Sequence, residues 1–342
     1  MKTYDLFIGT YTDGDSEGIY KMTFNANNGD LMDEVLAAKL PSPSFLAISH
    51  NQKNLYAVQE TADYDSIGGG ITSYAIENRE LTLLNSKGSG GAHPCHVAVS
   101  NDGQIAVSNY SGGNLAIFDL VEDGSLGEHQ LIEHNTADTT KTAHVHKSHF
   151  NEDGLFVADL GLSALKRYDK QPYGWVPAHQ NTIEMGKGAG PRHFEFSKNR
   201  EYLYVLNELN ASISVLKRDD EGSYNQIEVQ ATLPKDFEGE NACADIHLSN
   251  DGRFLYSSNR GENTIVIFEI TRETGKLSLV GRTSVNGDWP RNFTLDPTGN
   301  YLLVANQRSN NITVYKRDVE KGTLSFLKEK KLPSPVCLVF VK

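Results

Sequence analysis

The sequence is poor in cysteine and in long apolar stretches, and these two deficits exclude several classes of protein. Its three cysteines, Cys95, Cys243 and Cys337, lack the number and spacing of a disulfide framework or a metal-binding motif. No run of eighteen apolar residues is present, so no transmembrane helix is predicted. The first residues, MKTYDLFIG, contain no apolar signal region and lead almost directly into a predicted strand. We therefore expect a cytoplasmic protein that binds no metal ion and no cofactor.

Positive charge is also scarce. The chain has 32 Lys and Arg residues against 44 Asp and Glu residues, which gives a formal net charge of −12. This balance argues against nucleic acid as a partner, because contacts to phosphate groups need a basic surface. A few clustered arginines can nevertheless dominate a local field. A small anionic substrate is therefore compatible with the composition, whereas nucleic acid and membrane are not expected as partners; the sequence does not specify an oligomeric state.

A pattern of about fifty residues is repeated seven times along the chain. Each copy has an alternating apolar strand, a turn of the Asn-Gly or Asp-Gly type, a second strand rich in Leu, Tyr and Val, and a polar pair. Successive copies are 45 to 52 residues apart when measured between equivalent positions, which are Phe45, His96, Lys147, His193, Asp245, Asn292 and Cys337. Such a period is typical of β-propeller blades, because one four-stranded sheet cannot bury its own faces.

The seventh copy is completed by the two ends of the chain. After Cys337 only LVFVK remains, which suffices for one strand, whereas residues 4–25 have the pattern of the second and third strands of a blade. Closing the ring in this way removes two exposed sheet edges. An open β-solenoid or a pair of β-sandwiches would leave the complementary ends unexplained. We predict an all-β, single-domain protein over residues 1–342, a seven-bladed β-propeller of four-stranded antiparallel blades closed by strands from both termini.

Polar residues are predicted to converge at one mouth of the central channel. In an antiparallel pair the start of the first strand lies beside the end of the second, and the first strand of each blade lines the channel. Residues just before the equivalent positions should therefore lie near residues that end the second strands. The first group is Ser44, Cys95, His146, Arg192, Ala244 and Arg291; the second is Gln59, Glu60, Asn109, Tyr110, Asp159, Asn207, Glu208, Asn259, Arg260, Asn306 and Gln307.

These polar residues allow a structural and a functional interpretation. Asn suits strand ends, so a recurrent Asn can be a structural cap, and Glu208 can simply pair with Arg192 or Arg260. Arginines crowded near a channel need an anion or an acidic partner, however, because an unpaired buried charge is costly. A base, an acid and several guanidinium groups at one place favour an anion-binding catalytic pocket.

Four stretches resemble a known family: GAGPRHFEFS (from Gly188), LYVLNELNASISV (from Leu203), ADIHLSNDGRFLYSSNRGENTIVIFEI (from Ala244) and PRNFTLDPTGNYLLVANQ (from Pro290). They are similar to the bacterial 6-phosphogluconolactonase family of seven-bladed propellers, which is itself related to the fungal 3-carboxy-cis,cis-muconate lactonizing enzymes. The resemblance runs essentially from end to end. The words GPRH, NELN and ADIH are specific as a set, although none would suffice alone.

The resemblance also implies which residues act. The lactonizing enzymes have one His, two Arg and one Glu as proposed functional residues, which match His146 in HVH, Arg192 in GPRH, Glu208 in NELN and Arg260 in SNR. The repeat selects the same four positions, so we expect them to be catalytic. Other polar residues of the mouth are expected to bind substrate: His144, Asp159, Asn207, Asn259, Arg291, Asn306 and Asp245. Two assignments stay open. His144 would share a strand face with His146 and can exchange roles with it. His247 can either follow Asp245 into the channel or satisfy a local hydrogen bond.

The implied activity is hydrolysis of 6-phospho-D-glucono-1,5-lactone to 6-phosphogluconate, a step of the pentose phosphate pathway. Arg192 and Arg260 would hold an anionic group and polarise the carbonyl, since guanidinium offers a rigid fork of donors. His146, expected to titrate near neutral pH, or Glu208 would serve as the base. Phosphate recognition would need a further basic group, for which the candidates are Arg291, Lys187 and His193.

Three other functions remain open at this point. A muconate-type cycloisomerase would use the same groups, and a non-catalytic binding scaffold would use them as caps and ion pairs. A metal-dependent lactonase would place calcium or magnesium among oxygen ligands such as Glu60, Asn109, Asp159 and Asn207, although nearby arginines would repel the ion. For the three cysteines we expect the role of small buried apolar residues.

Overall fold

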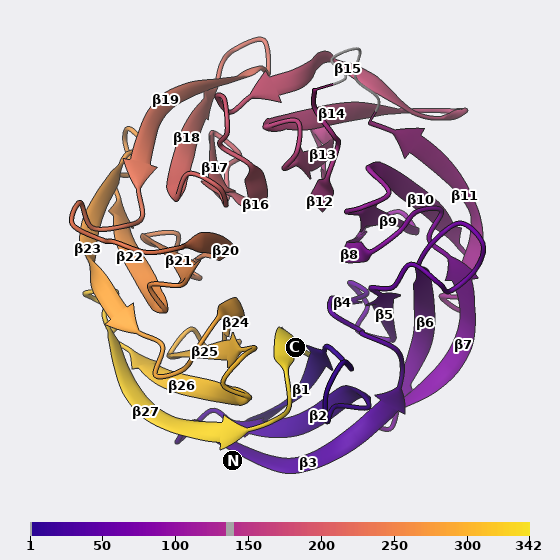
Figure 1. Ribbon diagram of the computed structural model, residues 1–342, viewed down its shortest axis with the longest axis horizontal. Helices are drawn as coiled ribbons and strands as arrows, with labels where there is room; N and C mark the ends of the chain where they lie inside the picture. The colour runs from indigo at the N-terminus through magenta and orange to yellow at the C-terminus, as the bar shows by residue number, and fades with distance from the viewer. Residues whose placement is uncertain (1, 135–139) are drawn as a thin grey trace.

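Seven four-stranded sheets surround a central axis in the computed structural model, which describes residues 2–134 and 140–342 (Figure 1). Every ladder within a sheet is antiparallel, from the innermost strand to the outer rim. The described residues contain strands and turns but no helix, and so none that could span a membrane. This arrangement confirms the seven-bladed β-propeller predicted from the repeat.

Six blades are formed by consecutive strands. Blades one to three contain β4 (Leu46–Ile48), β5 (Asn54–Gln59), β6 (Gly70–Glu77) and β7 (Glu80–Gly88); β8 (Pro94–Val99), β9 (Gln104–Asn109), β10 (Asn114–Leu120) and β11 (Leu126–Glu133); β12 (Val145–Asn151), β13 (Gly154–Asp159), β14 (Ala164–Gln171) and β15 (Gly174–Glu184). Blades four to six contain β16 (Pro191–Phe196), β17 (Tyr202–Asn207), β18 (Ser212–Arg218) and β19 (Tyr224–Ala231); β20 (Ala242–Leu248), β21 (Phe254–Arg260), β22 (Thr264–Ile270) and β23 (Leu277–Ser284); β24 (Pro290–Leu295), β25 (Tyr301–Asn306), β26 (Asn311–Arg317) and β27 (Leu324–Lys331).

The seventh blade joins the two ends of the chain, as predicted. Its innermost strand is β28 (Pro335–Phe340), followed by β1 (Thr3–Thr10), β2 (Gly18–Asn25) and β3 (Asp30–Lys39). The register pairs Leu6 with Phe340 and Ile8 with Leu338. Gly9 is required here, because a Cβ at that position would lie 2.3 Å from the Pro43 carbonyl oxygen. The ring therefore closes by backbone pairing between residues more than 300 positions apart.

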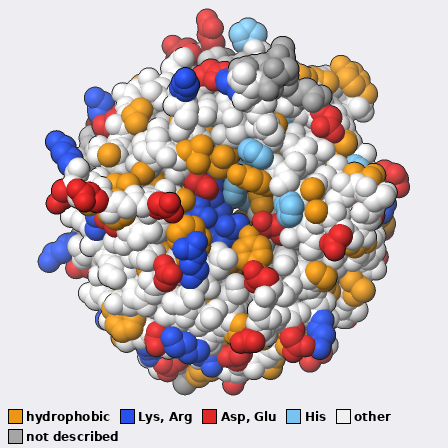
Figure 2. Space-filling view, in the orientation of Figure 1, with side chains coloured by type: hydrophobic (Ala, Val, Ile, Leu, Met, Phe, Trp, Pro, Cys, Tyr) orange, Lys and Arg blue, Asp and Glu red, His pale blue; other side chains and the backbone are white. Residues whose placement is uncertain are grey.

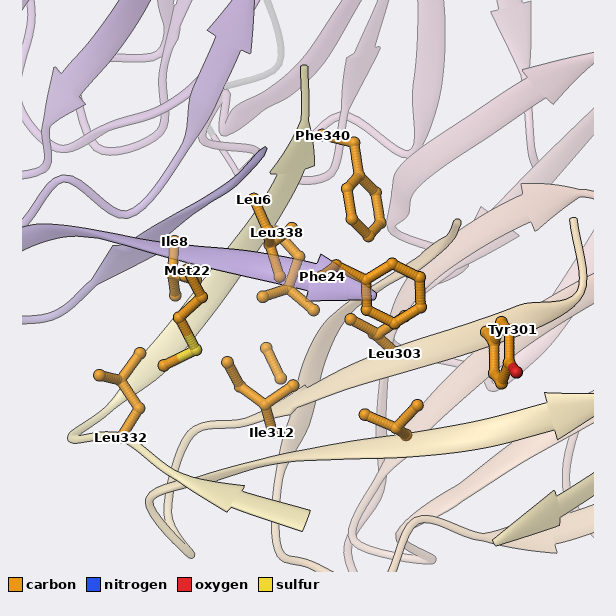
Figure 3. Close-up of a cluster of buried hydrophobic side chains, with 12 residues drawn as sticks. Leu6, Ile8, Met22, Phe24, Tyr301, Leu303, Ile312, Leu332, Leu338 and Phe340 are labelled. Carbon is orange, nitrogen blue, oxygen red and sulfur yellow. The ribbon is translucent and has the colours of Figure 1, made fainter. Parts of the chain in front are cut away.

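Apolar packing between blades reinforces this closure. Side chains of β28, β1 and β2 face those of β25 and β26 in one buried cluster (Figure 3). Phe24 is fully buried there, with ring centres 5.6 Å from Tyr301 and 5.4 Å from Phe340 in edge-to-face geometry. A fully buried aromatic side chain stabilises a fold by about 1.5–3 kcal/mol through the hydrophobic effect. The closing blade is therefore fixed by its neighbour as well as by its own ladder.

A β-bulge interrupts the pairing of the first and second strands in six blades, always at the same end of the channel. A bulge leaves one residue unpaired and re-aims its side chain. The bulged residues are Cys95, His146, Arg192, Arg291, Val336 and the pair Ala244–Asp245. Five of the six residues selected from the repeat as lying just before the equivalent positions thus leave the regular ladder; the exception is Ser44, which precedes β4.

Candidate active site at the channel mouth

Basic side chains gather in the central hollow of the face shown in Figure 2. Arg192 comes from the bulge of β16, Glu208 follows the end of β17, and Arg260 ends β21. Arg192 Nε and Arg260 Nη2 each lie 2.8 Å from the same oxygen, Glu208 Oε2. The structure therefore brings together three of the four residues expected to be catalytic, in a direct ion-pair cluster.

The two arginines of this cluster are fixed by backbone carbonyls of β20. Arg192 Nη1 donates to the Ala244 carbonyl, and Arg260 donates to the carbonyls of Ala242 and Cys243, each at 3.0 Å. Arg192 Nε forms an ion pair with Glu208 but no hydrogen bond of good geometry, because its N–H is not aimed at the carboxylate. Both guanidinium groups are therefore held in place largely independently of the Glu208 carboxylate.

Burial and charge in this cluster differ between its members. The side chains of Arg192 and Arg260 are only 3% and 5% exposed, whereas that of Glu208 is 18% exposed. Burial lowers the pKa of Arg260 to about 10, against the opposing effect of Glu208, so the group is still cationic at neutral pH. Two buried cations thus share one carboxylate that the channel can reach.

A second ion pair lies beside the cluster. Arg291, from the bulge of β24, has Nη2 3.8 Å from Glu60 Oε1 and lies over the ring of Tyr11 at 5.1 Å. Tyr11 donates a hydrogen bond of 2.8 Å to Glu60 Oε2, and Ser44 donates to the same oxygen. Arg291 is therefore already compensated by an acidic partner. Tyr11 was missed by sequence reasoning because the comparison of second-strand ends covered six blades and left out β1, the second strand of the split blade, where Tyr11 occupies the position of Glu208.

His146 reaches the same mouth from the bulge of β12. Its ring contacts Tyr110 and His193, with ring centres 5.9 Å and 5.1 Å away, and its buried Nδ1 has no hydrogen-bond partner among the described residues. Burial, assisted by the nearby Arg192 charge, lowers the pKa of His146 well below its ordinary value. The expectation that it titrates near neutral pH is therefore wrong. His144 stacks on Tyr110 at 4.5 Å, at the rim of the mouth.

The buried carboxylate of Asp245 binds residues that lie next to Arg192. Asp245 Oδ1 lies 2.7 Å from His193 Nδ1, and Asp245 Oδ2 lies 3.1 Å from His247 Nε2 and accepts a bond of 2.6 Å from Asn292. Burial and the Arg192 charge lower the pKa of His193 to about 3; Asp245 and Glu195 outweigh burial and raise that of His247 to about 10. His193 Nε2 lies 3.4 Å from Arg192 Nη1. Asp245 thus positions the residues behind Arg192.

Comparison with known proteins identifies the family to which this chain belongs. A family model described as "Lactonase, 7-bladed beta-propeller" matches residues 5–340. A 6-phosphogluconolactonase of Bacillus subtilis is 34% identical, with 100% of this chain and 99% of the relative covered. The chain belongs to this lactonase family. It is accordingly an enzyme of the lactonase class.

Two further relatives of this lactonase are informative. A 6-phosphogluconolactonase of Formosa agariphila is 36% identical, with 95% of this chain and 96% of the relative covered. The solved structure of a periplasmic gluconolactonase from Pseudomonas aeruginosa superimposes with a TM-score of 0.94 at 31% identity, covering 100% of this chain and 99% of that one. The relatives therefore carry names that refer to both a phosphorylated and an unphosphorylated lactone.

Four residues expected to bind substrate lie inside the blades of the lactonase. Adjacent residues of a strand point to opposite faces. Where Glu208 and Arg260 enter the mouth, the residue before each points into its own blade. Four such side chains have no exposed surface and are used in local hydrogen bonds: Asp159, Asn207, Asn259 and Asn306. We therefore do not include them in the proposed substrate contacts, and Asp245, which is 1% exposed, is assigned to positioning.

A separate cavity lies at the opposite mouth of the channel. It has a volume of about 920 Å³ and is lined by residues of β4, β8 and β12, including Lys147, and by Trp175 of β15. The lysines of its wall are already paired, Lys170 with Asp102 and Lys147 with Glu195, so this cavity does not have the excess of cations over carboxylates that the arginine cluster has. Over the described residues, no group of three or more His, Cys, Asp or Glu side chains is arranged to hold a metal ion. The arginine cluster is therefore the better candidate for an anionic lactone.

The altered pKa of His146 gives a pH prediction. Because its pKa lies well below 6.5, His146 is neutral on both sides of that pH. We expect kcat/KM to stay level between about pH 6 and pH 8, where an unperturbed histidine would change its charge. Initial rates measured in this range, corrected for spontaneous hydrolysis, test this. A sigmoidal change centred near pH 6.5 that disappears in His146→Asn would contradict the assignment.

Proposed function

We propose that the protein hydrolyses 6-phospho-D-glucono-1,5-lactone to 6-phosphogluconate at the mouth that contains Arg192, Glu208 and Arg260. The observation that carries this proposal is the pair of buried guanidinium groups sharing one partly exposed carboxylate. The names of two full-length relatives support the substrate. A cytoplasmic location and a place in the pentose phosphate pathway would follow from that substrate.

The arginines are proposed to bind the reacting carbonyl. Attack of water on this carbon converts the carbonyl oxygen into an oxyanion. Arg192 and Arg260 are held by β20 carbonyls before substrate arrives, so their remaining N–H groups are preorganised for the negative charge that develops. A donor of this kind typically contributes about 3 kcal/mol to transition-state stabilisation.

Glu208 is proposed to move the proton. Its carboxylate takes a proton from the attacking water while the new C–O bond forms. When the tetrahedral intermediate collapses, the bond from the carbonyl carbon to the ring oxygen breaks, and the protonated Glu208 returns the proton to that oxygen. His146, neutral at physiological pH, is suited to hydrogen bonding with the water or the ring oxygen rather than to donating a proton from an imidazolium. We assign the role of base to Glu208 because its carboxylate is more exposed than the buried ring of His146.

Turnover of freshly prepared 6-phosphoglucono-1,5-lactone by the purified protein tests this proposal. We expect hydrolysis well above the spontaneous rate, undiminished by a chelator, with 6-phosphogluconate as the product. Turnover abolished by chelator and restored by calcium or magnesium would favour a metal-dependent lactonase. Absence of turnover, together with lactonization of a carboxy-muconate, would favour a cycloisomerase; neither activity would favour a binding scaffold.

A further inference from the structure

Trp289 is held in an unusual backbone conformation at the rim of the mouth. It lies directly before β24 and has a φ of 66°, in the left-handed region that a bulky side chain rarely adopts. Its N–H donates to Asn263 Oδ1 at 3.0 Å, and its carbonyl accepts from the Gln307 N–H at 3.1 Å. The preceding residue, Asp288, donates its N–H to Ser309 Oγ at 2.8 Å. The same left-handed conformation recurs directly before β8, β16 and β28, at His93, Gly190 and Ser334, so it belongs to the blade connections, and the indole side chain is what is particular to this one.

Two arginines lie against the Trp289 ring. The guanidinium carbon of Arg260 is 5.3 Å from the ring centre, and that of Arg308 is 3.4 Å from it. Stacking uses the flat face of a guanidinium group and leaves the N–H donors at its edge available. The Trp289 indole therefore contacts one arginine of the catalytic cluster, Arg260, and one arginine outside it, Arg308.

Arg308 differs from the other arginines of the mouth in lacking an acidic partner. It is exposed, and within residues 2–134 and 140–342 no carboxylate lies at ion-pairing distance from it. Arg192 and Arg260 share Glu208, and Arg291 has Glu60. An exposed, stacked and uncompensated guanidinium group is well suited to an anion that arrives with the substrate.

We propose that Arg308, held by Trp289, forms a phosphate-binding subsite next to the Arg192–Glu208–Arg260 cluster and selects phosphorylated lactones. This inference rests on the proposed function. Arg260 and Arg308 contact one indole ring, so a single hexose phosphate can reach both. Of the residues considered from the sequence, Arg291 is paired with Glu60 and His193 is buried against Asp245. Lys187 is exposed, and within residues 2–134 and 140–342 no aromatic ring lies under its ammonium group as Trp289 lies under Arg308.

The ratio of kcat/KM for 6-phosphoglucono-1,5-lactone to kcat/KM for glucono-1,5-lactone tests the subsite. A charge-assisted contact to phosphate predicts that Arg308→Ala lowers this ratio by about 10- to 100-fold. Arg308→Lys should lower it less, since it keeps the charge but loses the stacked fork. Arg272→Ala is a matched control, because Arg272 is also exposed but lies in the turn between β22 and β23. The control should leave the ratio unchanged.

Two outcomes would overturn the subsite. One is an unchanged ratio in Arg308→Ala; the other is an equal loss for both lactones, which would indicate a role in the reaction itself. If the protein hydrolyses neither lactone, the proposed function fails, and calorimetric titration with 6-phosphogluconate and with gluconate decides the subsite separately. Weaker binding of 6-phosphogluconate alone in Arg308→Ala would support it, whereas equal affinities in variant and wild type would contradict it.

Discussion

Arg192→Ala is expected to lower kcat/KM for lactone hydrolysis by about 100- to 1000-fold, the usual effect of removing one preorganised donor from an oxyanion. The side chain is buried, lies 2.8 Å from Glu208 and is anchored on the Ala244 carbonyl, so solvent cannot readily replace it. Its loss also leaves Glu208 with Arg260 as its remaining partner in the cluster. Steady-state kinetics on the freshly prepared phosphorylated lactone measure the effect.

Two companion variants separate catalysis from general damage. Arg192→Lys keeps the positive charge but loses the planar fork, so an intermediate loss is expected. Arg79→Ala removes an arginine of the outer surface, where its side chain is 55% exposed and paired with Asp5, and should leave the kinetics unchanged. A folded Arg192→Ala protein with kcat/KM within threefold of wild type would contradict the assignment of this residue.

Asp245→Ala is expected to lower the free energy of unfolding by about 3–5 kcal/mol, the usual result of removing one partner from a buried ion pair. The substitution leaves the imidazolium of His247 and the amide of Asn292 without their acceptor on Asp245. Urea unfolding followed by far-ultraviolet circular dichroism measures the loss. Asp220→Ala, in an exposed turn, is the control and should change the stability by less than about 0.5 kcal/mol.

The same comparison has a defined pH dependence. The pKa of His247 is raised to about 10 in the folded protein, above its value of about 6.5 in the unfolded chain. The pairing with Asp245 therefore stabilises the fold fully below about pH 6.5, and this stabilisation is lost as the pH rises toward 10. The difference in stability between wild type and Asp245→Ala should shrink over that interval. A difference that grows with pH would show that His247 is not the protonated partner.

The fold was predictable because its information is repeated. Seven equivalent positions define the period, and a terminal blade split between residues 4–25 and the last strand explains how the ring closes. The same alignment located the mouth, since five of the six residues just before the equivalent positions bulge out of the ladder. His146, Arg192 and Arg291 could therefore be placed at the mouth from the sequence alone.

The details of the site were less predictable, for physical reasons. The spacing does not show which member of a pair such as Asn207–Glu208 faces the channel, because the register of the bulge decides it. Tyr11 follows β1 as Glu208 follows β17, and it escaped notice because the ends of the second strands were compared in only six blades. Trp289 and Arg308 lie in connections beyond the strand ends that were compared. The pKa of His146 depends on its burial beside Arg192, which a sequence does not show. The chemistry, in contrast, rests on the resemblance and on family membership.

A crystal structure of the protein with 6-phosphogluconate, the product of the proposed reaction, is the most direct test of the account. We expect the product carboxylate to lie between Arg192 and Arg260 and its phosphate to contact Arg308 beside Trp289. Product bound in the cavity at the opposite mouth, near Lys147 and Trp175, with the arginine cluster still paired to Glu208, would contradict it.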